Sequence, residues 1–408
     1  MIDSSDVEMR KSILDKDVTA GRPTLLSRPI LAVFAASFGA MMSFYMLLSV
    51  VPQFAASVGA TGIGAGFATG ALMLSTVLAE LGTPALVSRF GYRLVIVAGL
   101  LLLGLPAIAM GSARTVAAIL ALCIVRGVGV AILVVLGGAL VASLVPDERR
   151  GEGLGLYGFV VGVPAVIGLP LGLWLAEHAG YHVVFLAGGL VALAGIAAAP
   201  LLPGRKPQPK QQLGMRALFR RPEFIRPSIL FSLTTMAAGA IVTFLPMALV
   251  HASGSFVAIA LLVQAAAATM TRWWAGARGD RHGSARLLVP AILVAALGIL
   301  ALLQTSSLTV VMIGMGLFGA GFGVAQNASL AVMFERASPS DYDSVSALWN
   351  LAYDAGLGIG AAGFGVVAAQ TGYAAAFGVL AAMMLAVILI VGRDRSDARR
   401  VAAKPCVL

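Results

Sequence analysis

Four ionisable side chains lie inside long apolar stretches of this sequence, far from any polar break. They are Glu80, Arg126, Arg272 and Asp354. Hydrocarbon cannot solvate a charge, so an ionisable residue within a membrane-spanning segment is a candidate for binding a proton or a substrate. Helical rise places all of them about 14–17 Å from the nearest polar boundary. The pattern predicts that these side chains cluster near the middle of a membrane.

Two acids and two bases at one depth have two interpretations. They can form static ion pairs that hold helices together, or at least one acid can change its protonation during a functional cycle. Burial disfavours a charged carboxylate and a nearby arginine favours it, so small helix movements can add or remove a proton. The second interpretation assigns proton coupling to Asp354, Glu80 and Arg126, and it leaves Arg272 as a substrate-binding candidate.

Asp354 has the more favourable surroundings of the two acids. Asn350 lies one helical turn earlier on the same face, and the closely spaced glycines within residues 356–360 would let a neighbouring helix approach closely. Gln326 and Asn327 are also costly in lipid and are expected to face the protein interior. Substrate contact and hydrogen bonding between helices are the two roles open to these amides.

The composition indicates that the apolar stretches are membrane helices. The chain has 408 residues, of which 59% are hydrophobic and 11% charged, whereas soluble domains have about 45–50% and about 25%. One crossing takes about 20 apolar residues, and the apolar runs here are continuous rather than alternating as in a membrane β-barrel. The sequence excludes a soluble enzyme and predicts an all-α membrane protein with twelve transmembrane helices. The predicted spans are 29–53, 62–87, 94–111, 115–144, 153–176, 182–202, 225–250, 255–276, 286–304, 308–334, 344–369 and 373–391.

Basic residues set the predicted orientation. Of the 28 lysines and arginines, all but Arg114 and Arg126 lie at or toward one side of the predicted membrane. This is the cytoplasmic side by the positive-inside rule. Both termini are then cytoplasmic in a multi-pass protein of the cell (inner) membrane, and no cleavable signal peptide is expected. The predicted regions are a cytoplasmic N-terminal tail (1–27), a six-helix bundle (28–202), a cytoplasmic linker (203–222), a second six-helix bundle (223–392) and a cytoplasmic tail (393–408).

Two landmarks of the sequence recur at a single offset of 192 residues. The segment 89–91 recurs as 281–283, and Gly180-Tyr181 recurs as Gly372-Tyr373. Because both landmarks share one offset, an internal duplication is expected. Two similar halves around a site at the membrane midplane are the layout of a secondary transporter.

The break after the eighth predicted span carries a motif. Residues 276–283 read Gly-Ala-Arg-Gly-Asp-Arg-His-Gly and resemble the Gly-x-x-x-Asp-Arg-x-Gly signature of the major facilitator superfamily. The corresponding segment 84–91 departs from it, because Pro84 replaces the first glycine and Ser88 replaces the aspartate. The resemblance implies two pseudo-symmetric six-helix bundles with loops that act in the conformational cycle. The residues of this conformational motif are Ser88, Arg89, Gly91, Arg93, Gly276, Asp280, Arg281 and Gly283. Among them, Arg93 is expected to lie in solvent.

Two further segments resemble motifs of proton-coupled exporters in this superfamily. Arg126, within the segment 124–129, resembles the arginine motif of the fourth helix. Gly168, Pro170 and Gly172 resemble the glycine- and proline-rich motif of the fifth helix and join the conformational motif. The resemblance therefore implies a twelve-helix drug or metabolite:proton antiporter.

The resemblance also places candidate residues relative to one another. Helices two and eleven of the superfamily meet across the interface between the bundles, which would bring Glu80 and Asp354 together as a pair that shares a proton. The first, seventh and tenth spans resemble the superfamily's cavity-lining helices. The predicted substrate-binding residues are Asn327, Gln326, Asn350, Arg272, Tyr45, Met46 and Met236. For each methionine, plain packing is the alternative.

The predicted function is secondary active transport, by proton-coupled efflux of a small amphipathic drug or metabolite through alternating access. The alternatives are proton-coupled uptake of a metabolite by symport, and a non-transporting membrane sensor or scaffold. The sequence has no metal or nucleotide motif in a suitable context, so no catalytic residue, metal or cofactor is expected, and a proton gradient is the energy source. The expected partners are a small-molecule substrate, protons and the lipid bilayer, without nucleic acid, and the expected protein is a monomer.

Overall fold

The computed structural model describes residues 27–145, 150–204, 215–249, 251–338 and 341–386. Within these ranges the chain is helical and forms no strand. The tail predicted at 393–408, almost all of the tail predicted at 1–27 and part of the linker predicted at 203–222 lie outside them.

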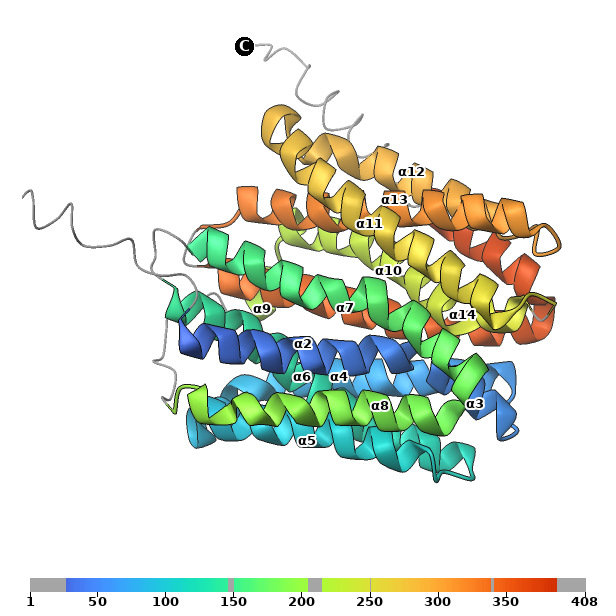
Figure 1. Ribbon diagram of the computed structural model, residues 1–408. Helices are drawn as coiled ribbons and strands as arrows, with labels where there is room; N and C mark the ends of the chain where they lie inside the picture. The colour runs from blue at the N-terminus through green and yellow to red at the C-terminus, as the bar shows by residue number, and fades with distance from the viewer. Residues whose placement is uncertain (1–26, 146–149, 205–214, 250, 339–340, 387–408) are drawn as a thin grey trace, which may run out of the picture.

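The helices form an N-terminal and a C-terminal half (Figure 1). The first half contains α2 (Arg28–Leu48), α3 (Val50–Ser57), α4 (Gly62–Phe90), α5 (Tyr92–Met110), α6 (Val116–Leu144), α7 (Arg150–Ala179), α8 (Tyr181–Ala194) and the 3-10 helix η2 (Gly195–Leu201). The second half contains α9 (Met215–Leu218), α10 (Pro222–Ala248), α11 (Gly254–His282), α12 (Ala285–Ala301), α13 (Leu308–Glu335), α14 (Tyr342–Thr371) and a helix over Tyr373–Ala386.

Length and surface both fit a membrane protein. In the described ranges, 10 helices are long and apolar enough to cross a bilayer, and the helices 285–301 and 373–386 are shorter apolar ones. Large apolar side chains such as Leu74, Phe159 and Trp273 are exposed on the helices, as expected of surfaces that face lipid. The predicted all-α, multi-pass membrane architecture is confirmed, and the number of twelve helices stays a prediction.

Four helix junctions each contain a glycine with positive φ, which is the only linking residue at three of them and is followed by Ser284 at the fourth. Gly91, Gly180, Gly283 and Gly372 have φ angles of 81°, 82°, 85° and 80°. At Gly91 the ψ angle is 163°, a region of backbone space that is essentially restricted to glycine. These glycines fall at the landmarks of the internal repeat, so the offset of 192 residues in the sequence corresponds to a repeated backbone turn.

The starts of α4 and α11 also correspond. The hydroxyl of Thr61 accepts a hydrogen bond from the N–H of Gly64, and the hydroxyl of Ser253 accepts one from the N–H of Phe256. Such caps satisfy N–H groups that lack a partner in the first helical turn. Because Thr61 and Ser253 are also 192 residues apart, α4 and α11 begin and end at equivalent residues, and each has 29 residues.

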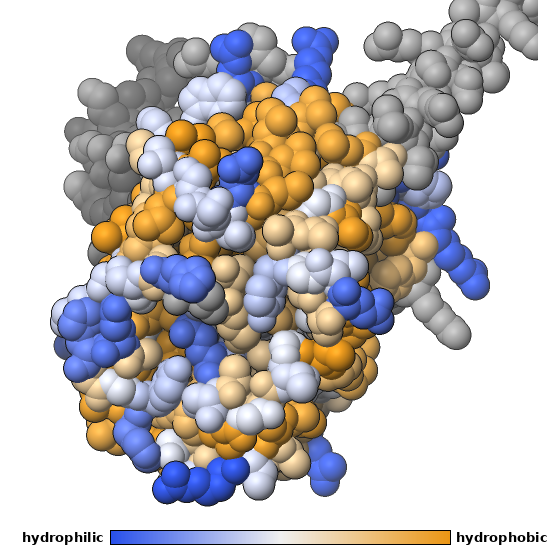
Figure 2. Space-filling model, turned by 90° about the vertical axis from the view of Figure 1, so that its right-hand side faces the viewer, coloured by the Kyte–Doolittle hydropathy of each residue, from blue (hydrophilic) through white to orange (hydrophobic). Residues whose placement is uncertain are grey.

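The two halves meet where α4 packs along α14 and α7 packs along α11. Their close contacts lie toward the end where α4 and α11 begin, which we call the closed end. There a Cβ atom on Gly66 would lie 2.5 Å from the carbonyl oxygen of Ala361, and the hydroxyls of Thr69 and Thr243 form a hydrogen bond of 3.1 Å across the halves. Figure 2 looks onto this end, over which hydrophilic side chains are spread.

The opposite end, where α4 and α11 finish, is the open end. A Cβ atom on Gly82 would have no neighbour within 4 Å. In Figure 1, α11 and α12 diverge from α5 and α8 toward this end. The halves are therefore joined at the closed end and separate toward the open end.

Replacing Gly91 with alanine is expected to lower the free energy of unfolding by about 1–3 kcal/mol, because a side chain is disfavoured at this φ and ψ. Gly82→Ala is the matched control: Gly82 is helical and has room for a methyl group, so alanine should be neutral or stabilising there. Thermal unfolding in detergent measures both variants. An unchanged midpoint for Gly91→Ala would show that the junction does not need glycine.

Candidate functional site

The carboxyl groups of Glu80 and Asp354 meet across the interface between the halves. Glu80 lies on α4 and Asp354 on α14, and the two side chains form a hydrogen bond. Asp354 is only 6% exposed, and the Oε1 atom of Glu80 is buried with no protein donor among the described residues. The proximity that the family resemblance implied is therefore present. A hydrogen bond between two carboxyl groups needs a proton on one of them, so a contact of this kind suits a pair that shares a proton.

Two tyrosines and an arginine surround this pair. Tyr45 on α2 and Tyr353 on α14 lie close enough for their hydroxyl groups to interact. Asp354 interacts electrostatically with both tyrosines, and so does Arg272 of α11. We call Tyr45, Glu80, Arg272, Tyr353 and Asp354 the polar cluster. It brings together helices of both halves, so its contacts depend on how the halves are placed.

Glycines of α7 position Tyr45. A Cβ atom on Gly168 would lie 3.0 Å from the Cβ atom of Tyr45, and one on Gly172 would overlap the carbonyl oxygen of Met46. The glycines of the predicted fifth-helix motif, which flank the half-buried Pro170, therefore let α7 contact the backbone of α2 directly. Any larger residue at position 172 would push α2, and Tyr45 with it, away from its present place.

Glycines of α14 position Asp354 in the same way. A Cβ atom on Gly356 would overlap the hydroxyl of Thr235, and one on Gly360 would overlap the carbonyl oxygen of Met236, both on α10. Gly358 faces the other half, with the Cβ atom of Met73 on α4 only 2.6 Å from a Cβ atom placed there. The close helix approach predicted from this glycine spacing is confirmed.

Arg126 lies apart from the polar cluster, which corrects the prediction of one group of four ionisable residues. Its side chain is 1% exposed. One guanidinium nitrogen donates to the carbonyl oxygen of Ser43 at 3.4 Å, and Nε has no partner among the described residues. Its electrostatic neighbour is Cys123, one turn earlier on α6. In the described chain neither Arg126 nor Arg272 forms an ion pair with an acid, so this arrangement gives no support to the static ion-pair interpretation.

The remaining predicted substrate-binding residues lie on four helices, α2, α10, α13 and α14. Asn350 on α14 and Gln326 and Asn327 on α13 are half-buried, and the amide nitrogen of Asn327 would lie 3.4 Å from a Cβ atom on Gly276. Met46 is 2% exposed. Their contact with a substrate stays a prediction, as does that of Met236.

The conformational motif of the N-terminal half makes contacts within that half. Ser88 donates to the carbonyl oxygen of Ala85, and the guanidinium of Arg89 lies 5.3 Å from the centre of the Phe90 ring. Arg93 is exposed, as expected, and it also donates to carbonyl oxygens at the end of η2, at 3.0 Å to Pro200 and 2.8 Å to Leu202. The side chains of Asp280 and Arg281 lie outside the described part of the chain.

Sequence reasoning missed Tyr353. Its ring lies 6.2 Å from that of Trp349 and 5.9 Å from that of Phe231 on α10, and the Phe231 and Trp349 rings stack at 4.6 Å. Aromatic rings therefore line one side of the polar cluster. The available signal was the position of a tyrosine next to Asp354 in an otherwise apolar stretch.

The sequence pattern of the Major Facilitator Superfamily matches residues 33–271 and, in a second match, residues 228–405. The chain belongs to the Major Facilitator Superfamily. Among curated relatives, the uncharacterized MFS-type transporter YtbD of Bacillus subtilis is 22% identical over 304 residues, which cover 70% of this chain and 76% of YtbD. The uncharacterized MFS-type transporter MJ1560 of Methanocaldococcus jannaschii is 23% identical over 168 residues, covering 41% of this chain. The matches to MJ1560 and two further relatives span 44%, 33% and 30% of those proteins.

A solved structure of similar shape is that of a D-xylose-proton symporter. It has a TM-score of 0.74 at 14% identity and covers 89% of this chain and 96% of its own. Similarity at this identity shows the fold alone, which is the major facilitator fold. Family and fold together indicate a membrane transporter rather than an enzyme. Within the described ranges no group of histidine, cysteine, aspartate and glutamate residues could hold a metal ion, and independence of cofactors stays a prediction.

Replacing Arg126 with methionine is expected to leave the midpoint of thermal unfolding unchanged or to raise it, because a buried charge without an acidic partner costs free energy that an apolar side chain of similar size does not. The control is Arg89→Met, at the exposed end of α4, which should leave the midpoint unchanged. Unfolding of both variants in the same detergent gives the comparison. A clearly lower midpoint for Arg126→Met would mean that the guanidinium stabilises the fold.

Proposed function

We propose that this transporter exports a small amphipathic drug or metabolite in exchange for protons, by alternating access. The observation that supports this most directly is the pair of carboxyl groups, Glu80 and Asp354, hydrogen-bonded between the two halves. A titratable pair in this place links proton binding to the arrangement of the halves, which is what coupling requires.

The proposed cycle uses repulsion between the carboxylates. With a shared proton, the pair attracts and joins α4 to α14; without it, two negative charges face each other in a poorly solvated site. Loss of the proton then favours separation of the helices. Arg272, which already acts on the neighbouring tyrosines, is the cation best placed to compensate the charge that remains. By the orientation inferred from basic residues, the open end faces the cytoplasm.

The proposed substrate class follows from the surroundings of the polar cluster. Tyr45 and Tyr353 present hydroxyl groups, while Trp349 and Phe231 present aromatic faces nearby. A site that combines apolar walls with a few polar groups suits a molecule with one polar and one apolar part. The titratable pair beside it allows substrate binding and proton release to compete.

Proton-coupled uptake is the second candidate, and a specific observation favours it. Arg126 is a buried cation with no acidic partner in the described chain, so it is available to bind an anionic metabolite. One solved structure of similar fold is a D-xylose-proton symporter. Transport by inside-out and right-side-out vesicles distinguishes the two directions. A sensor or scaffold, by contrast, would keep its function after Asp354→Asn and Glu80→Gln.

Asp354→Asn and Glu80→Gln are each expected to abolish substrate-driven proton movement, because an amide cannot exchange the shared proton. A thermal-shift screen of purified protein first identifies a ligand, and proteoliposomes with a trapped pH-sensitive dye then report proton movement when that ligand is added. Glu223→Gln, an exposed carboxylate at the start of α10, is the control and should transport normally.

Both variants should still bind the ligand in the thermal-shift assay, which separates loss of coupling from loss of folding. Proton movement at the wild-type rate in either variant would overturn the assignment of that residue. Absence of proton movement in the wild type, with ligand transport present, would overturn proton coupling itself.

A further inference from the structure

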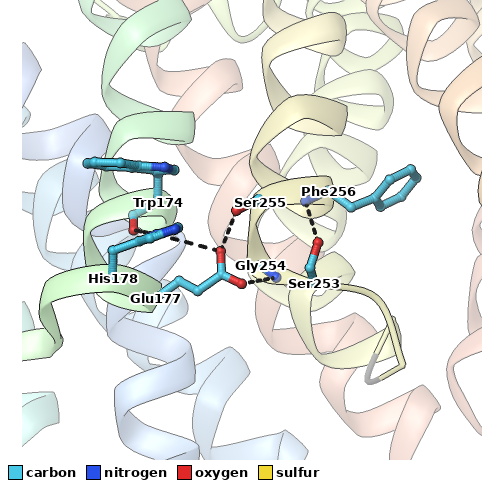
Figure 3. A network of polar contacts seen from close by, with 7 residues as sticks. All are labelled: Trp174, Glu177, His178, Ser253, Gly254, Ser255 and Phe256. Atoms are coloured by element: carbon cyan, nitrogen blue, oxygen red, sulfur yellow. Dashed lines mark hydrogen bonds and ion pairs between the residues drawn. The ribbon is translucent and has the colours of Figure 1, made fainter.

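Glu177, near the end of α7, reaches across to the start of α11 (Figure 3). Its Oε1 atom accepts a hydrogen bond of 2.9 Å from the N–H of Gly254, and its Oε2 atom accepts one of 2.7 Å from the hydroxyl of Ser255. Since α7 belongs to the N-terminal half and α11 to the C-terminal half, these bonds join the two halves directly. They lie at the closed end, on the side opposite the contacts of α4 with α14.

The chemistry of a helix start explains why a carboxylate binds here. The first N–H groups of a helix have no helical partner and carry partial positive charge. Ser253 satisfies the N–H of Phe256 within its own half, while Gly254 receives its acceptor from the other half. Hydrogen bonds to a carboxylate are stronger than those between neutral groups. The N–H of Gly254 therefore has Glu177 as its acceptor only while the two halves are in contact at the closed end.

Neighbouring side chains orient Glu177. The Nδ1 atom of His178 lies 2.8 Å from the carbonyl oxygen of Trp174 and 3.9 Å from Oε2 of Glu177. The rings of His178 and Trp174 stack with centres 4.7 Å apart. The end of α7 thus presents the carboxylate toward α11.

The equivalent interface on the other side of the molecule lacks such a contact. At the offset of the internal repeat, Ala369 on α14 corresponds to Glu177, and it has no side-chain acceptor. There a Cβ atom on Gly365 would lie 2.9 Å from the carbonyl oxygen of Gly62 on α4, so glycines bring the backbones together instead. The hydrogen bonds of Glu177 therefore belong to one of the two equivalent interfaces and do not follow from the duplicated fold.

We propose that Glu177 is a latch: its hydrogen bonds to Gly254 and Ser255 stabilise the closed end and break each time that end opens. The proposal rests on the alternating access proposed above. A cavity of about 240 Å³ lies directly beside the latch and is lined from both halves, by Leu173 of α7 and Val257 of α11 among others. Opening of the latch widens this cavity and exposes Val257, which is now 3% exposed.

The test is the rate at which a cysteine at position 257 is alkylated by a polar maleimide. The background carries Cys406→Ser, while Cys123 is buried and stays. The purified protein is labelled in detergent, where both ends are accessible, without substrate or a proton gradient. Glu177→Ala is expected to raise the alkylation rate about two- to fivefold, as the loss of a solvent-exposed charged contact does. Glu177→Gln, which keeps one acceptor, should fall between Glu177→Ala and the parent protein.

Ser255→Ala removes a donor from the opposite half and gives a second, independent variant. It should also raise the rate, and adding it to Glu177→Ala should give less than the product of the two single effects, because the residues act through one shared contact. Glu223→Ala, a carboxylate at the open end of α10, is the control and should leave the rate unchanged. Thermal midpoints close to that of the parent show that each variant is folded.

Equal alkylation rates in the parent, Glu177→Ala and Ser255→Ala would overturn the latch. A raised rate in a protein that shows no ligand-driven proton movement would leave the latch standing and overturn the proposed function. Normal proton-coupled transport together with unchanged alkylation rates in the variants would overturn the latch and leave the proposed function standing. The two proposals therefore fail by different measurements.

Discussion

A hydrogen bond between two carboxyl groups exists only while a proton is present, and in this protein it joins one half of the molecule to the other. Glu80 and Asp354 are held by different halves, so in the proposed function their protonation and the placement of the halves are linked. The link would arise because two carboxylates without the proton repel in a site that water reaches poorly. The remaining features of the site act by setting the distance between these groups.

Direct backbone contact between helices sets that distance. Gly172 brings α7 onto α2 at Met46, Gly360 brings α14 onto α10 at Met236, and Gly358 brings α14 against Met73 of α4. At Gly172 and Gly360 the neighbouring atoms are backbone, so no flexible side chain can absorb a displacement there, and close-packed interiors transmit strain. Tyr45 and Asp354 are therefore held by rigid surfaces, although both lie near the interface at which the halves must move.

The sequence predicted the features that depend only on the position of a residue along the chain. Apolar runs predict helices, repeated glycines predict the junctions, and the number of residues from a polar break predicts the depth of Glu80 and Asp354. Depth says nothing of the direction in which a side chain points around its helix. For that reason Arg126, at the predicted depth but on α6, was wrongly placed with the polar cluster. Only the family resemblance, which states which helices meet, predicted the carboxyl pair.

Contacts between a side chain and a distant backbone were beyond sequence reasoning. Arg93 binds carbonyl oxygens at the end of η2, and Glu177 binds the start of α11. Both residues lie at polar breaks, where charged side chains are ordinary, and their partners are main-chain groups that every residue possesses. The types and spacing of these residues do not predict their contacts. Each contact forms because the fold places a helix end beside the side chain.

The turns at Gly91, Gly180 and Gly372, each one residue long, and the two-residue turn at Gly283 limit how the helices can move. A connection of one residue is too short to change its length, so the two helices that it joins can slide or tilt only slightly relative to each other. If α4 swings away from α14, α5 is carried with it, and α8 follows α7 in the same way. The pairs α4–α5 and α7–α8 are thus stiff hairpins of antiparallel helices, each of which would move as a unit.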